Sequence, residues 1–386
     1  MKRIIILIAA VAFAAVSCSK NESAGTAGSQ AIAFQAQAGV STKAPAITGT
    51  TFPVTETFSV YAWTAATLTE YFMNNVTVAF DNGGTADDTS DDTWKPQGET
   101  FYWPKDATVD FIAYYPTGIE GITVKENEIK FEGVDVKTLQ KDIMYSDKAV
   151  GFSNNVDLVS DAVSAYNGVP IIFRHAISKV KILAELTYNY KKEEDGTETE
   201  WTVKVNSASL SGLYTKGNCT MTLADASNPG IIGWNKPDGG VWEVTGATSS
   251  VTGLSNTTVV PGKEYTAIEE LFVMPQALSA GVQKITLNLT ITTKRNGVDF
   301  LSETFEKSAD IYIASLDAWE INHSYTYKIM LSPTSSNGNG GNPYADPNDP
   351  SSSVDPSNPD LSDAIITFDP AVDGWEGIDV VATINL

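Results

Sequence analysis

The chain has 386 residues, which is more than one ordinary domain needs and enough for two. Hydrophobic residues make up 42% of it, so it can bury sizeable cores and is not disordered as a whole. The 25 Lys and Arg against 47 Asp and Glu give a net charge of −22, which argues against binding nucleic acid or anionic lipid surfaces. Only two His and two Cys are present, which argues against a His/Cys metal site and a disulfide framework. We expect no cofactor and no metal.

The start of the chain has the features of a bacterial export signal. Two basic residues are followed by an apolar run from Ile4 to Val16. This run is too short to span a bilayer, which takes about 20 residues, but it has the length of a signal-peptide core. It ends in small residues before Cys18, as in the lipobox of bacterial lipoproteins. Residues 1–17 are therefore predicted to be a lipoprotein signal peptide and Cys18 the lipidated residue. The alternative is a simple export signal that leaves Cys18 as a free thiol.

The body of the chain has the pattern of an all-β protein. Runs of β-branched and aromatic residues are interrupted at short intervals by Gly, Asn-Gly, Asp-Gly or Pro. In Lys284–Thr292 every odd-numbered residue is apolar and every even-numbered one is polar, which predicts a strand with one buried face. A hairpin turn is predicted at Asn296-Gly297, and Val180–Leu186 alternates like the first strand.

A domain boundary is predicted near Asn167-Gly168, which gives an N-terminal domain of residues 44–167 and a C-terminal domain of residues 168–332. The helical signal is weak, with at most a turn or two in Val134–Leu139 and Val156–Ala165. Cys219 is expected to be a small core residue on a strand rather than a catalytic thiol.

The composition changes abruptly after Ser332. Residues 333–363 contain six Pro, five Asp and no Lys or Arg, which predicts a linker. Strand character returns in residues 364–386, an arm too short to build its own core. The alternating apolar residues at the end of this arm are Val380, Ala382, Ile384 and Leu386.

A matching apolar alternation occurs near the other end of the chain, within the predicted propeptide of residues 18–43. Its members are Ile32, Phe34, Ala36, Ala38 and Val40. A flexible stretch with an exposed basic residue follows, so the Lys43-Ala44 bond is a candidate site for a trypsin-like protease. We hypothesise that the N-terminal strand blocks a groove, that cleavage releases it, and that the arm of a neighbouring subunit then fills the groove as a donor strand. Head-to-tail contacts of this kind generate a filament. The alternative is that both end strands pair within their own chain.

Several segments in a fixed order resemble the Bacteroidales-type fimbrillin family, the subunits of major and minor fimbriae. These segments are Phe58–Trp63, Tyr102–Pro104, Asp110–Pro116, Asp142–Ser146, Phe173–Val180 and Trp319–Tyr327. The resemblance covers most of the chain and includes the lipobox-like start.

The resemblance implies two tandem transthyretin-like β-sandwich domains and a C-terminal donor-strand arm. It also implies export as an outer-membrane lipoprotein, trimming by a processing protease at Lys43-Ala44, and polymerisation with other fimbrial subunits into an extracellular fimbrium, with a contribution to adhesion. The family's donated segment corresponds to residues 364–386. Lys43 stands where the family has Arg for an arginine-specific protease, so the identity of the protease stays open, as do the roles of stalk, anchor and tip.

No sequence motif supports an enzyme. Gly-x-Ser-x-Gly, His-Glu-x-x-His and Walker sequences are absent, and His175 and His323 are expected to be hydrogen-bonded strand residues. The acidic stretch Asp81–Asp92 could hold calcium but lacks EF-hand spacing, so a solvated hairpin tip is favoured. An alternative function is a monomeric glycan-binding surface lipoprotein that uses aromatic platforms. Trp63, Trp103 and Trp319, however, are expected to lie in the core.

Overall fold

The computed structural model describes residues 32–38, 50–65, 70–85, 92–153, 168–222, 231–235, 241–245, 256–314, 316–331, 366–374 and 379–381. Almost all regular structure in these ranges is β, which confirms the predicted all-β class. One short helix, α1 (Val136–Leu139), lies where a helical turn was expected, and the carboxylate of Asp135 caps it. Within the same ranges, no helix has the length and apolar character needed to span a bilayer. The predicted turn at Val156–Ala165 lies outside the described residues.

The N-terminal half forms a nine-stranded sheet that closes on itself, because β6 pairs with both β3 and β9. In spatial order the strands are β10 (Ala149–Phe152), β6 (Val109–Tyr115), β3 (Phe58–Thr64), β4 (Met73–Asp81), β5 (Thr93–Pro96), β1 (Phe34–Ala38), β11 (Val169–His175) and β9 (Met144–Ser146), with β2 (Thr50–Thr51) paired to β1. The sheet encloses the first core, whose largest members include Phe34, Phe52, Phe58, Phe111 and Phe173.

The C-terminal half is built from two further sheets. One sheet contains β19 (Glu264–Val273), β12 (Ser178–Leu186), β24 (His323–Leu331), β25 (Ile366–Gly374) and β26 (Asp379–Val381). The other contains β13 (Tyr190–Lys192), β14 (Glu198–Tyr214), β21 (Lys284–Arg295) and β22 (Val298–Asp310), with β17 (Val241–Thr245) and β18 (Thr257–Val259) paired to β14. Alternate residues of both sheets fill the second core, among them those of β12 and β21.

The predicted strands and hairpin of this half are confirmed. Ile285, Leu287, Leu289 and Ile291 of β21 are buried while the residues between them are not. Val180, Ile182, Ala184 and Leu186 of β12 show the same alternation. Arg295 pairs with Val298 across the two-residue turn Asn296-Gly297, and both turn residues have positive φ, as a type I′ turn requires.

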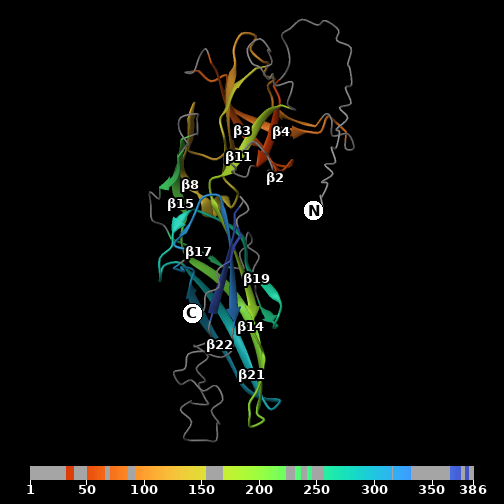
Figure 1. Ribbon diagram of the computed structural model, residues 1–386, viewed down its shortest axis with the longest axis vertical. Helices are drawn as coiled ribbons and strands as arrows, with labels where there is room; N and C mark the ends of the chain where they lie inside the picture. The colour runs from red at the N-terminus through yellow and green to blue at the C-terminus, as the bar shows by residue number, and fades with distance from the viewer. Residues whose placement is uncertain are drawn as a thin grey trace, which may run out of the picture.

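A third sheet joins the two halves (Figure 1). From the N-terminal half come β7 (Ile122–Lys125) and β8 (Glu128–Asp135), and from the C-terminal half come β15 (Lys216–Thr222) and β16 (Ile231–Asn235). The junction core beneath it includes Tyr61, Phe131, Cys219, Met221 and Met274. A small additional pair, β20 (Gln276–Ala277) with β23 (Ala318–Trp319), completes the C-terminal half.

The buried Lys148 ties the first sheet to the turn between β7 and β8. Its Nζ lies 3.1 Å from Asp110 Oδ2 and 3.0 Å from Glu126 Oε1, and its side chain is only 7% exposed. Because a buried ammonium is costly unless it is paired, these contacts fix the hairpin against the N-terminal sheet.

The chain passes from the first sheet to the second between β11 and β12. β11 still pairs with β1 and β9, so the changeover lies between His175 and Ser178. This crossing between sheets lies after Asn167-Gly168, where the sequence predicts a domain boundary, and that boundary stays a prediction.

Candidate functional site

The N-terminal strand β1 occupies an interior position in the first sheet. On one side it runs parallel to β11, with Phe34 opposite Val169 and Ala38 opposite Phe173. On the other side it pairs with β2 and, at Phe34, with Trp94 of β5. Taking β1 away would therefore leave unpaired backbone on both sides of a strand-shaped slot.

Two residues of the predicted blocking strand are anchored in the first core. Ile32 is 2% exposed, and its amide donates to the carbonyl of Phe101 at 2.8 Å. Phe34 is fully buried and makes edge-to-face contacts with Phe111 and Phe58, with ring centroids 5.6 and 6.3 Å away. Ala36 and Ala38 lie at the register positions of the buried Ile171 and Phe173. Val40, Lys43 and Ala44 lie outside the described residues.

A cluster of aromatic side chains from later parts of the chain lies in the core next to β1. Phe52, directly after β2, is fully buried, and its ring lies 4.9 Å from Phe173 and about equally far from three others, Phe58, Trp94 and Tyr115. These side chains belong to strands that follow the Lys43-Ala44 bond, so cleavage there would leave them in place. The sequence analysis did not single out Phe52.

Gly168 permits the close approach of β11 to β1. Its φ is +121°, and a Cβ there would lie 2.7 Å from the carbonyl carbon of Phe34. The next residue, Val169, donates its amide to the carbonyl of Ala33 at 2.8 Å. A glycine is needed here for both reasons. The sequence showed Gly168 only as half of a turn signal.

The C-terminal arm pairs with its own chain. β25 runs antiparallel to β24 over its full length, and β26 pairs with β25, with Val380 opposite Val372. Of the predicted donor residues, Val380 lies in β26, and Ala382, Ile384 and Leu386 lie outside the described residues, as does the predicted linker of residues 333–363. Thus each end strand, where described, pairs with the body of the same chain.

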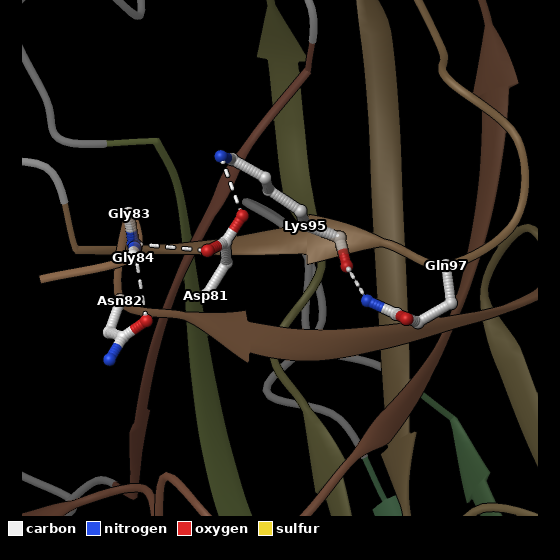
Figure 2. A network of polar contacts seen from close by, with 6 residues as sticks. All are labelled: Asp81, Asn82, Gly83, Gly84, Lys95 and Gln97. Carbon is white, nitrogen blue, oxygen red and sulfur yellow. Dashed lines mark hydrogen bonds and ion pairs between the residues drawn. The ribbon is translucent and has the colours of Figure 1, made fainter.

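The first residues of the acidic stretch, Asp81 to Gly84, contact one another and a basic side chain (Figure 2). Asp81 Oδ2 accepts from Lys95 Nζ at 2.8 Å, and Asp81 Oδ1 accepts from the amide of Gly83 at 3.0 Å. Asn82 Oδ1 accepts from Gly84, so the segment is a turn organised by its own side chains. Lys95 and the Gly83 amide lower the pKa of the Asp81 carboxyl. Within the described ranges, no group of three or more His, Cys, Asp or Glu side chains is placed to bind a metal ion.

The two histidines and Cys219 lie in contacts that stabilise the fold. His175 Nδ1 lies 2.5 Å from Asp142 Oδ2, and His323 Nδ1 lies 2.8 Å from the carbonyl of Ile321. Cys219 is fully buried in β15, and burial raises the pKa of its thiol to about 12. A thiol in this state is a poor nucleophile at neutral pH.

Of the three tryptophans considered as glycan platforms, two are buried and the third is partly buried. Trp63 and Trp319 are 3% and 1% exposed, and Trp103 is half-buried against the first core. Trp319 also donates its indole N–H to the hydroxyl of Tyr327 at 2.8 Å. These side chains pack in or against the cores. The strand-shaped slot that β1 fills is therefore the candidate functional site.

A protein-family model described as fimbrillin-like matches residues 42–342. The chain belongs to the fimbrillin-like family. This fimbrillin-like protein is thus similar to structural proteins of surface fimbriae, which associate with other fimbrial subunits. A comparison with curated proteins found no match.

Solved structures are similar to the fimbrillin-like chain to different degrees. A fimbrial protein from Bacteroides vulgatus is 16% identical, with a TM-score of 0.50, over 82% of this chain and 92% of that one. A candidate cell adhesion protein from Bacteroides uniformis is 20% identical, with a TM-score of 0.42, over 78% and 93% of the two chains. The fimbrial anchor protein Mfa2 from Porphyromonas gingivalis is 8% identical, with a TM-score of 0.28, over 89% and 97%.

Proposed function

We propose that this chain is a structural subunit of a surface fimbrium that polymerises by strand exchange. It is exported as a lipoprotein anchored through Cys18 and is trimmed between Lys43 and Ala44. The vacated β1 slot then receives the C-terminal strand of a neighbouring subunit, from Val380 to Leu386. The two halves of the body are separate folding domains in this scheme, and the assembled fimbrium contributes to adhesion.

The observation that carries this proposal is the position of β1. Ile32 and Phe34 are buried in the first core, yet β1 precedes the proposed cleavage bond in the chain. The family match begins at residue 42 and so leaves the blocking strand outside the shared stretch. A replacement strand would restore the lost main-chain hydrogen bonds and refill the apolar positions of Ile32 and Phe34.

The processing step is tested by mass spectrometry of fimbriae shed from cells that express the full chain. Polymer subunits are expected to begin at Ala44. Lys43→Ala is expected to accumulate lipid-anchored precursor, whereas the matched control Lys20→Ala, upstream of β1, is expected to be processed normally. Polymer whose subunits still start at Cys18 would refute the trimming step.

The donor strand is tested by deleting Asp379–Leu386. We expect folded monomers that no longer form SDS-resistant ladders, because the strand that fills the neighbour's slot is missing. A matched control changes the alternate positions with Thr383→Ser and Asn385→Ser and is expected to polymerise. Ladders from the deletion variant would rule out exchange through this strand.

A further inference from the structure

The two strands of the C-terminal arm are attached to the body to very different extents. β25 pairs with β24 along all nine of its residues, from Ile366 opposite Leu331 to Gly374 opposite His323. β26 has three residues and pairs only with β25. Removing β26 breaks a short ladder at the sheet edge, whereas removing β25 breaks the longest pairing that the arm makes.

The register of β25 sets four of its apolar residues opposite buried residues of β24. Opposite Ile366, Phe368, Pro370 and Val372 are Leu331, Ile329, Tyr327 and Tyr325, each at most 4% exposed. A slip by one residue would set polar residues such as Thr367 and Asp369 opposite these buried positions of β24, so the sequence favours the observed register.

The strand that β25 covers is part of the second core. Tyr327 of β24 is fully buried, and its hydroxyl accepts the indole N–H of Trp319. β24 is bordered by β12 on its other side, so β25 shields the edge at which Tyr327 and Ile329 lie. Taking β25 out of the sheet would expose this edge and the core beneath it.

We propose that β25 is a permanent strand of its own subunit and that only the segment after Gly374 crosses to the neighbour. This inference rests on the strand exchange proposed above and narrows it. The arm of residues 364–386 then has two parts, of which Ile366–Gly374 completes the donor's own C-terminal sheet. β26 peels from β25, and its residues become the start of the donated strand.

If β25 stays in its own sheet, the length of chain after Gly374 limits how far the donated strand can extend from the body. Leu331 pairs with Ile366, so the two residues that flank the intervening segment are adjacent and the length of that segment adds no reach. From Gly374 to Val380 the chain has six steps, which span about 20 Å when fully extended. The slot of the accepting subunit must therefore open within about 20 Å of Gly374.

Two disulfide locks that share one cysteine test the proposal in the full chain. Thr326→Cys with Ala371→Cys joins β24 to β25, and Ala371→Cys with Val381→Cys joins β25 to β26, since both pairs are register partners. Opposite residues have Cα atoms about 4.5–5.5 Å apart, within the range that a disulfide spans. Met330→Cys with Thr367→Cys provides a second β24–β25 lock, and thiol counting confirms each bond.

The β24–β25 locks are expected to leave the SDS-resistant ladders unchanged. The β25–β26 lock is expected to reduce polymer at least tenfold, with recovery after mild reduction. If both β24–β25 locks abolish the ladders reversibly, the whole arm leaves the body, and this inference is wrong while strand exchange stands. If the β25–β26 lock leaves the ladders intact, the terminal strand is not donated, and the proposed function itself fails.

Discussion

Truncating Phe34 to alanine should strongly destabilise the precursor and leave the trimmed subunit unaffected. A phenylalanine side chain that is fully buried removes about 150–200 Å² from water, and at about 25 cal/mol per Å² this contributes about 4–5 kcal/mol. Phe→Ala substitutions in protein cores lower the free energy of unfolding by about 3–5 kcal/mol. This range already includes the loss of contacts such as those of Phe34 with Phe58 and Phe111. A loss of about 4 kcal/mol raises the unfolded fraction about a thousandfold.

The assay is guanidinium unfolding of the precursor without its signal peptide, followed by near-UV circular dichroism. Phe34→Ala should shift the transition of the N-terminal half and leave that of the C-terminal half in place. Gln35→Ala, at the next position of the same strand, is the matched control and should cost less than about 1 kcal/mol. After cleavage at Lys43 the variant and wild-type bodies should unfold identically. A loss below about 1 kcal/mol for Phe34→Ala would refute the conclusion that β1 is integral to the first core.

Four further outcomes are expected. Gly168→Ala should cost the precursor about 2 kcal/mol or more in thermal unfolding, because its positive φ disfavours a Cβ and the new atom meets Phe34; an unchanged midpoint would contradict this. Lys148→Met should lose about 3–5 kcal/mol in urea unfolding, because two carboxylates lose their buried partner; an unchanged or increased stability would contradict this. Cys219 should resist thiol reagents at pH 8 in the folded chain and react fully in denaturant, because burial raises its pKa to about 12 and almost no thiolate is present; rapid native labelling would disprove its burial. Replacing residues 337–353 by a short Gly-Ser loop should leave polymer yield unchanged, since Leu331 and Ile366, which precede and follow this part of the chain, already pair with each other; lost polymerisation would show that its length sets the reach of the arm.

The sequence correctly predicted strands that have one buried face and one solvent-exposed face. β12 and β21 alternate because each covers one side of the second core. β3 does not alternate, because Phe58 and Val60 face the first core while Tyr61 and Trp63 face the junction core. Phe58–Trp63 entered the sequence analysis only as a segment of the family resemblance, and the two layers that this strand separates were not predicted.

The partners of the end strands could not be predicted from their periodicity. The alternation at Ile32 and Phe34 indicates a strand with one apolar face, and this face lies in the first core as the blocking-strand hypothesis requires. The same kind of pattern in the arm left its partner open, because apolar alternation specifies a face and not a neighbour. Glycine is needed at residue 168 because the backbone of Ala33 and Phe34 lies close to it. These residues are distant in sequence, so the local turn pattern could not predict the requirement.

The sheet that joins the two halves decides how a subunit responds to tension. In a filament under load, force that is applied to the N-terminal half must reach the C-terminal half through several connections side by side. These are the covalent crossing after His175, the ladder between β8 and β15, the bond from Gln140 Nε2 to the Phe272 carbonyl at 3.0 Å, and the bond from Trp234 Nε1 to the Ala176 carbonyl at 2.5 Å. Because these connections share the load, the halves should move as one stiff segment, and compliance in the filament should arise at the contacts between subunits.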